Sequence, residues 1–147
     1  MAVLKIKGAL VVMNAMISSA SGLRVHMTKM DVIANNIANV NTKDFQSSRV
    51  TLQDSFSQTI QQARQARNGN AGTNPMQVGS GVSLASIDRL ETQGAMRIVD
   101  GETEVMSNTD LAVEITTMIT TQRAFEANAR VIPVADSMLE ELVNLKA

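Results

Sequence analysis

A stripe of apolar residues near the start of this 147-residue chain constrains its fold more than any other feature. The stripe advances by alternating steps of four and three residues, through Met16, Ala20, Leu23, Met27, Met30, Ala34 and Ile37. Such heptad spacing places one side of a helix along a second helix. We therefore predict a long helix from about Leu10 to Asn39.

Four asparagines, Asn35, Asn36, Asn39 and Asn41, crowd the end of this stripe. Asparagine is a poor helix former, but its carboxamide donates and accepts hydrogen bonds without carrying charge. Fraying of the helix end explains Asn39 and Asn41 more readily than Asn35 and Asn36. We therefore expect Asn35, Asn36 and Asn39 to form hydrogen bonds between packed helices or between subunits.

The C-terminal segment carries a second heptad stripe, which polar Gln122 and Asp136 interrupt. Its apolar members are Leu111, Ile115, Met118, Phe125, Ala129, Ile132, Leu139 and Val143. Residues 107–110 offer helix-capping side chains. Pro133 predicts either a kink within one long helix or a joint between two shorter ones, and we favour the kink. Two such stripes predict a mainly α fold, in which long N- and C-terminal helices pair as an antiparallel coiled-coil hairpin.

The middle of the chain is predicted to be irregular. A short helix is expected from Thr51 to Arg67, because Leu52, Phe56, Ile60 and Ala63 would share one face. A flexible loop should follow at 67–75, and then a small β excursion over 78–105. Asp100-Gly101 is a hairpin-turn signal within that excursion. One domain thus has three parts, residues 1–45, 46–106 and 107–147.

Composition argues for thin helical packing and against catalysis. The chain has three aromatic residues, all phenylalanine, and no cysteine, so a thick aromatic core and thiolate metal sites are excluded. Its net charge of −1 with scattered Lys and Arg gives no nucleic-acid footprint. The one histidine, His26, is interpreted as a residue that flanks the apolar stripe beside Met27 and has no special function. We expect no catalytic, metal or cofactor-binding residues, and no small-molecule substrate.

The N-terminus resembles a signal peptide only superficially. Lys5 and Lys7 precede an apolar run, and residues 18–20 could pass for a cleavage site. Cleavage there would cut the amphipathic helix in half, so we expect no cleaved signal. The apolar run at 9–12 is too short to span a membrane. Met13 or Met16 would serve equally well as the first residue of the chain.

Two motifs resemble the bacterial flagellar axial proteins, that is, the basal-body rod and hook family. Residues 30–42, which read MDVIANNIANVNT and are followed by Phe45, are similar to the family's N-terminal signature, with Gly22-Leu23 ahead of them. Residues 107–111 and 118–128, SNTDL and MITTQRAFEAN, are similar to its C-terminal helix. The resemblance covers about half of the chain, and both motifs stand at the expected ends.

The resemblance implies a structural subunit of the rod or hook, located in the flagellum and not an enzyme. It implies terminal helices that stack around an export channel in a hollow tube that transmits torque. It also implies passage through the flagellar type III export apparatus. Expected partners are copies of the chain in a helical array, other rod or hook proteins and the export apparatus. Residues 81–85 and 92–94 resemble distal-rod and hook proteins, whereas the length resembles a proximal-rod protein.

Both stripes and the family motifs define the expected assembly interface. Its members are Met16, Ala20, Leu23, Met27, Met30, Ala34, Asn35, Asn36, Ile37, Asn39, Leu111, Ile115, Met118, Gln122, Arg123, Phe125, Asn128, Ile132 and Leu139. A two-helix hairpin exposes its outer faces to water, so we expect stability to come largely from assembly. The alternative is a helical coiled-coil adaptor or secretion chaperone, which would leave the β excursion unexplained.

Overall fold

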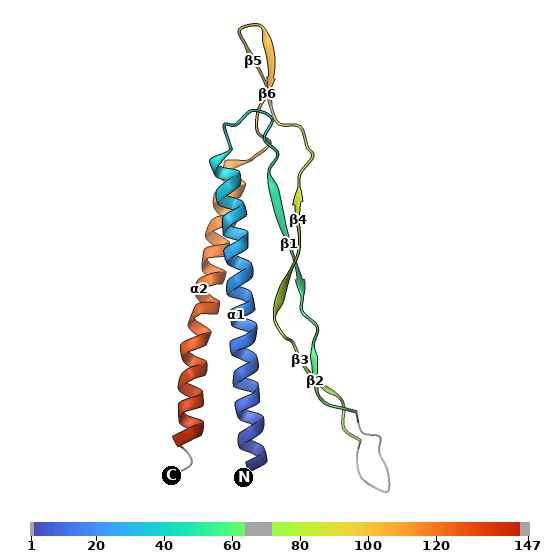
Figure 1. Ribbon diagram of the computed structural model, residues 1–147, viewed down its shortest axis with the longest axis vertical. Coiled ribbons are helices and arrows are strands. Elements are labelled where there is room, and N and C mark those ends of the chain that lie inside the picture. Colours follow the sequence, from blue (N-terminus) through green and yellow to red (C-terminus); the bar gives the residue numbers. More distant parts are fainter. Residues whose placement is uncertain (1, 64–71, 145–147) are drawn as a thin grey trace.

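Two long helices form the body of the molecule in the computed structural model, which describes residues 2–63 and 72–144. Helix α1 covers Ala2–Ala38 and helix α2 covers Leu111–Asn144. They lie side by side and antiparallel, and both chain ends are found at the same end of the pair (Figure 1). The predicted antiparallel hairpin of a mainly α chain is therefore observed, although α1 begins well before Leu10.

The strands between the helices form three two-stranded antiparallel pairs. Strand β1 (Ser48–Asp54) pairs with β4 (Val82–Arg89), and β2 (Gln58–Gln61) pairs with β3 (Met76–Val78). Together these four strands make one long ribbon, which runs along α1 on the side away from α2 (Figure 1). Strands β5 (Met96–Val99) and β6 (Glu102–Val105) form a separate hairpin beyond the helices.

The helix predicted from Thr51 to Arg67 is wrong, because strands β1 and β2 occupy this segment through Gln61. Along β1 the side chains of Ser48, Val50 and Leu52 are half-buried and alternate with exposed neighbours. A period of two is typical of a strand. The segment follows this period, although the apolar residues spaced four apart had suggested a helix. Residues 64–67 and most of the predicted loop at 67–75 lie outside the described residues.

The hairpin turn at Asp100-Gly101 is confirmed. Asp100 has a φ of 53° and Gly101 a φ of 85°, so both central residues of the two-residue loop are left-handed. That conformation matches the twist of a tight hairpin and is the reason Asp-Gly is favoured there.

Helix α2 starts and continues as its residue types suggest. The Oδ1 atom of Asp110 accepts hydrogen bonds from the backbone nitrogens of Ala112 and Val113, at 2.9 and 3.2 Å. Asp110 is therefore the N-cap. Pro133 lies inside one uninterrupted helix, which excludes the alternative of two shorter helices. The Ser137 hydroxyl donates to the Pro133 carbonyl at 3.0 Å.

The buried interior is small and lies almost wholly along the helices. Among the described residues, the buried ones are Val12, Ser19, Gly22, Val25, Ile33, Asn36, Ser47, Ser107, Thr121 and Ala135. None of them belongs to a strand. The ribbon therefore lies on the surface of the helix pair and has no core of its own.

Candidate assembly surfaces

Three contacts two heptads apart fix the register of α1 against α2. A Cβ on Gly8 would lie 3.6 Å from the side chain of Leu142, and one on Gly22 would lie 2.6 Å from Nδ2 of Asn128. At the other end, Asn36 donates to Glu114 Oε1 at 3.1 Å. Glycine at the first two contacts lets the helices approach closely, and the third is a hydrogen bond between buried or half-buried side chains.

The stripe of α1 that these contacts define is not the predicted one. It runs through Gly8, Val12, Ala15, Ser19, Gly22, His26, Lys29, Ile33 and Asn36, which are all buried or half-buried. From Ala15 on, each member precedes a predicted stripe residue by one position. One residue turns a helix by about 100°, so the pairing face is small and partly polar, and the predicted stripe lies beside it.

The predicted stripe of α1 remains partly open to solvent. Ala20, Met27 and Ala34 are exposed, with Met27 at 55 %. Met16, Leu23, Met30 and Ile37 are half-buried. These residues are therefore free to contact a neighbouring molecule, and their role in assembly stays a prediction.

On α2 the observed pairing face differs from the predicted stripe at alternate positions, where the residue one position earlier is covered. Met118, Phe125, Ile132 and Leu139 are half-buried as expected, while Thr121 and Ala135 are buried in place of the exposed Gln122 and Asp136. The two polar interruptions are thus outside the pairing face. Of the remaining expected interface residues, Asn128 is half-buried, and Leu111, Ile115 and Arg123 are exposed.

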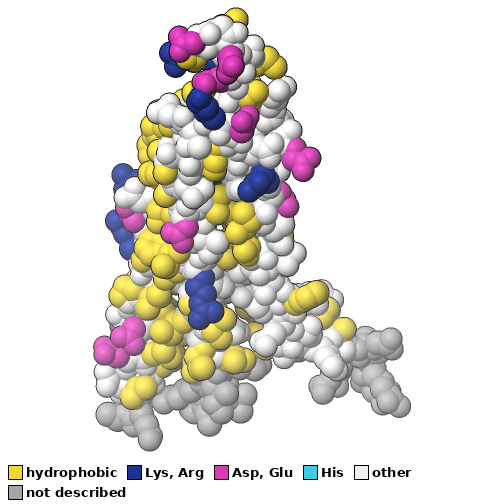
Figure 2. All heavy atoms as spheres, turned by 45° about the horizontal axis from the view of Figure 1, so that its top comes forward, with side chains coloured by type: hydrophobic (Ala, Val, Ile, Leu, Met, Phe, Trp, Pro, Cys, Tyr) yellow, Lys and Arg dark blue, Asp and Glu magenta, His cyan; other side chains and the backbone are white. Residues whose placement is uncertain are grey.

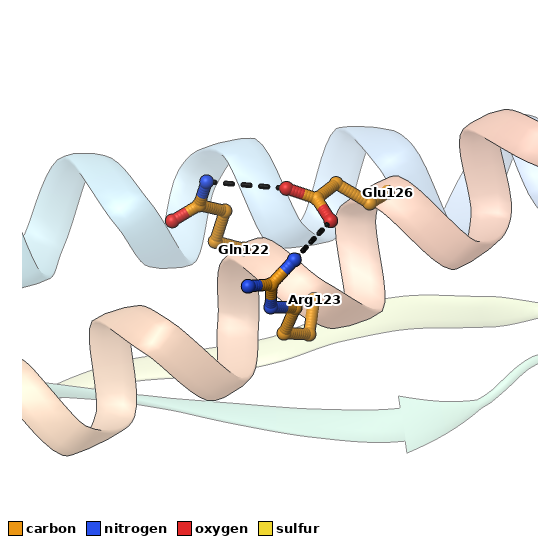
Figure 3. A network of polar contacts seen from close by, with 3 residues as sticks. All are labelled: Gln122, Arg123 and Glu126. Carbon is orange, nitrogen blue, oxygen red and sulfur yellow. Dashed lines mark hydrogen bonds and ion pairs between the residues drawn. The ribbon is translucent and has the colours of Figure 1, made fainter.

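Gln122 and Arg123 contact a carboxylate of their own helix. Gln122 Nε2 donates to Glu126 Oε1 at 3.1 Å, and Arg123 donates to Glu126 Oε2 at 2.9 Å (Figure 3). The Arg123 side chain is 74 % exposed, so this ion pair adds little to stability in water. The network instead presents an ordered arrangement of polar groups on the outer side of α2.

Asn36 connects three elements within the chain. Its side chain is 1 % exposed. Its Nδ2 donates to the Ser48 carbonyl at 2.8 Å and to Glu114, while its Oδ1 accepts from the Ser48 nitrogen at 2.9 Å. The carboxamide thus closes a pair of hydrogen bonds with the first residue of β1, as a neighbouring strand would. The bond to Glu114 joins α1 to α2, as expected of an asparagine between packed helices, whereas the pair of bonds to β1 was not foreseen from the sequence.

The neighbouring asparagines differ from Asn36. Asn39 Nδ2 donates to the Asn35 carbonyl at 2.9 Å, and its Oδ1 accepts from the Thr42 hydroxyl at 3.1 Å. Asn39 therefore caps the end of α1 and acts at the helix terminus of its own chain. Asn35 is exposed and remains a candidate for contacts between subunits.

Asn108 holds the hairpin end of the molecule together, a role that sequence analysis missed by treating it as a helix cap. Its Nδ2 donates to the carbonyls of Leu90 and Thr92, both at 2.8 Å, and its Oδ1 accepts from the Ser47 nitrogen at 2.7 Å. Nearby, a Cβ on Gly94 would overlap the Met106 carbonyl. One carboxamide and one glycine therefore bring three segments together at this end.

The ribbon contacts α1 through small residues. The Val82 nitrogen donates to the Ser21 hydroxyl at 3.1 Å, and a Cβ on Gly81 would lie 3.0 Å from Ser18 Cα. Gly81 also has a φ of 96°, which disfavours any other residue. The β1–β4 ribbon is thus placed on α1 by a close backbone approach.

The outer faces of both helices are rich in apolar groups. Exposed large side chains are Leu10, Val11, Met13, Ile17 and Met27 on α1, and Leu111, Val113, Ile115, Ile119, Val131, Val134, Met138 and Val143 on α2. Figure 2 shows apolar patches along the body of the molecule and charged side chains at the hairpin end. Exposed apolar side chains gathered on one face are typical of surfaces that contact other molecules.

Threonines extend the apolar character of α2. The hydroxyls of Thr116, Thr117 and Thr121 donate to the carbonyls four residues earlier, at 2.7–2.8 Å. Their donors are therefore used inside the helix. The Gly8–Ala38 part of α1 is also long and apolar enough to cross a membrane, and in this structure one side of it packs against α2 and the ribbon.

A groove of about 210 Å³ lies where α1, α2 and β1 meet. Its apolar lining comes from Val32, Ile33, Val50, Leu90 and Val113. Charged side chains of Lys29, Arg49 and Glu114 line it as well. The groove is open and lies beside the Asn36 contacts.

Residues suited to catalysis or metal binding do not gather in the described part of the chain. No group of three or more His, Asp or Glu side chains there is placed to hold a metal ion. Nδ1 of His26 is buried without a hydrogen-bond partner among the described residues. Burial, and secondarily the charge of Lys29, lower the pKa of His26 below its usual 6.5.

Both terminal segments match known families. Residues 14–46 match the family described as "Flagella basal body rod protein", and residues 105–145 match "Flagellar basal body rod FlgEFG protein C-terminal". These two segments contain most of α1 and nearly all of α2. The chain belongs to the flagellar rod and hook protein family.

Similar proteins include both hook and rod components. The chain is 51 % identical over 85 residues to the flagellar hook protein FlgE of Borreliella burgdorferi, covering 58 % of this chain and 19 % of that protein. It is 45 % identical over 93 residues to FlgE of Treponema pallidum, with 63 % and 20 % covered. It is 45 % identical over 83 residues to the basal-body rod protein FlgG of Bacillus subtilis, covering 56 % of this chain and 31 % of that protein.

The chain spans only a fifth to a third of these relatives' own lengths. The similar proteins thus include both rod and hook components, as the sequence motifs predicted. An unrelated adaptor or secretion chaperone is not favoured, because both ends of the chain match axial components of the flagellum.

Proposed function

We propose that this chain is a structural subunit of the flagellar rod or hook. Its terminal helices would pair as a coiled coil and polymerise into a hollow tube that encloses the export channel and transmits torque. The observation that carries the proposal is the match of both helices to rod and hook families, combined with apolar outer faces that the single chain leaves uncovered. Expected partners are further copies of the chain and other rod or hook proteins.

The chemistry of the described surface supports a structural role over catalysis. The groove is lined by aliphatic side chains, by three charged side chains and by the hydroxyl-bearing residues Ser47, Ser48 and Thr117. The proposal includes export through the flagellar type III apparatus without a cleaved signal, and the continuity of α1 across residues 18–20 supports it.

Electron microscopy of the purified protein tests the proposal, with Met27→Asp as the informative variant. More than half of the Met27 side chain is exposed in the single chain, whereas in the proposed array a charge at this position would be buried. Burying an unpaired charge is costly, so we expect the wild type to form tubes or stacks and the variant to remain monomeric. The variant should keep the circular dichroism of the wild-type monomer.

Ile98→Asp provides the matched control. Ile98 is an exposed aliphatic residue on the β5–β6 hairpin, away from the helix faces, so this variant should polymerise normally. In a strain that depends on this chain for motility, the Met27 variant should not swim, whereas the Ile98 variant should. Tubes or swimming with Met27→Asp would show that the exposed face of α1 is not an assembly surface.

A further inference from the structure

Phe56 is the most exposed large apolar side chain of the described residues, at 97 %. It lies between β1 and β2, flanked by Ser55 and Ser57, where the ribbon passes from one strand pair to the next. A chain with only three aromatic residues thus presents one of them entirely to solvent. Exposed aromatic side chains of this kind are typical anchors at protein interfaces.

The groove between α1, α2 and β1 offers a matching recess on the same molecule. Ile33 is buried within it, Val32, Val50 and Leu90 are half-buried, and Val113 is 51 % exposed. The volume of about 210 Å³ gives room for a single aromatic side chain. Aliphatic walls around an aromatic ring are the usual environment of a buried anchor.

Phe56 is too far from this groove to fill it in its own chain. Val50 lines the groove, and Phe56 follows it by six residues, just beyond the end of β1 at Asp54. At about 3.3 Å per residue, an extended chain would separate the two positions by up to roughly 20 Å. A second copy shifted by that distance along the ribbon would bring its Phe56 level with the groove.

Charge also favours contact between copies. Asp54, two residues before Phe56, is exposed, and within the described residues no ion pair is formed by Asp54, Lys29 or Arg49. Lys29 and Arg49 line the groove together with Glu114, whose carboxylate accepts a hydrogen bond from Asn36, so the two cations outnumber the one anion. A Phe56 side chain that enters the groove of a second copy would carry the Asp54 carboxylate toward these two cations.

We propose that Phe56 of one copy inserts into the groove of the next copy, with Asp54 against Lys29 and Arg49. Because donor and recess lie at different places on the chain, the contact is head-to-tail and generates an open array instead of a closed dimer. The inference rests on the proposed function, since it requires neighbouring copies, and it names the ribbon as a contact that α1 and α2 do not supply.

Disulfide cross-linking tests this contact cleanly, because the chain has no cysteine. One sample mixes Phe56→Cys with a size-tagged Val113→Cys and exposes them to mild oxidant at high concentration and after assembly. Both positions are exposed, so the variants should fold. We expect a mixed dimer at least tenfold more abundant than either homodimer.

Ile98→Cys replaces Phe56→Cys in the control mixture, since Ile98 is also exposed and apolar. It should give no mixed dimer with Val113→Cys. As a second measurement, Arg49→Glu and Asp54→Lys should each slow assembly at least several-fold, and the two variants mixed together should assemble faster than either alone.

The outcomes separate this contact from the proposed function. Tubes without the Phe56–Val113 cross-link, or cross-linking by Ile98 in its place, would overturn the inference and leave the structural role intact. The cross-link without tubes would support the contact and count against polymerisation into a tube. Absence of both cross-link and tubes would overturn both.

Discussion

The helix pair and the long ribbon differ in how much of themselves they bury. Eight of the ten buried residues lie on α1 or α2, and the other two, Ser47 and Ser107, lie in the segments that lead into β1 and α2. Among the described residues the ribbon contributes no buried side chain, and it contacts α1 at Ser48, which pairs with Asn36, and at Gly81, which lies against Ser18 and Ser21. The helix pair therefore sets its own register, whereas the ribbon depends on α1 for its position.

This difference indicates that the helix pair and the ribbon have different roles. The helices match the rod and hook families, and their contacts at Gly8, Gly22 and Asn36 define one alignment. Two-stranded ribbons are marginally stable alone in water. Contact with a neighbouring molecule would therefore stabilise the ribbon, and we expect its stability to rise on assembly.

The largest expected effect is at Asn36, the residue that ties both regions together. Asn36→Ala would leave the Ser48 backbone groups and the Glu114 carboxylate without their partner, and we expect a loss of about 2–4 kcal/mol in the free energy of unfolding. Thermal or urea unfolding of the monomer measures it. Asn35→Ala, one residue earlier and exposed, is the control and should change the stability by less than about 0.5 kcal/mol. Equal effects in the two variants would contradict the assignment.

A second substitution should release the ribbon while leaving the helices paired. Gly81→Ala adds a Cβ against Ser18 and Ser21 and strains a residue with positive φ, at a cost of about 1–2 kcal/mol. Hydrogen exchange should show faster exchange in β1 and β4 and unchanged protection in α2. Gly79→Ala, where a Cβ meets nothing within 4 Å, should leave exchange unaltered. Loss of protection throughout the chain would show that ribbon and helices unfold as one unit.

The close approach of the helices can be tested with a pair of glycine variants. Alanine is the better helix former by about 1 kcal/mol, so Gly8→Ala, whose new Cβ makes only ordinary contact with Leu142, should raise the melting temperature. Gly22→Ala places its Cβ 2.6 Å from Asn128, and we expect this overlap to cancel or reverse the gain. A similar rise in both variants would mean that Asn128 moves aside without cost.

The smallest effect should come from pH. Because burial lowers the pKa of His26, the unfolded chain binds more protons than the folded one below about pH 6.5. Stability should be complete above that pH and decline as the pH falls through 6.5 toward the lower pKa of the folded state. Melting temperatures at pH 7.5 and 5.5 measure this decline, and His26→Gln should reduce it. If the melting temperature of the variant fell by the same amount between pH 7.5 and 5.5, the decline would be due to carboxylates and not to His26.

Several elements of the fold could be predicted from local sequence. Heptad spacing predicted both long helices, Asp110 predicted the start of α2, and Asp100-Gly101 predicted the hairpin turn, because each depends on residues near one another in the chain. The motifs at the two ends also predicted the family, which the comparisons confirmed. The strands of residues 48–61 were missed, because their partners lie 15 to 41 residues further along the chain and the apolar spacing of that segment also fits a helix.

Only the tertiary structure decided which face of each helix pairs. The most apolar stripe was the natural choice, but two helices approach closely where Gly8, Gly22 and Ala135 remove bulk, one residue away from that stripe. The role of Asn36 was likewise undetermined, since a carboxamide has the same donors and acceptors whether its partner is a subunit or a strand of its own chain. The sequence alone determined the helices and their ends, whereas long-range packing determined the register and which surface is left for assembly.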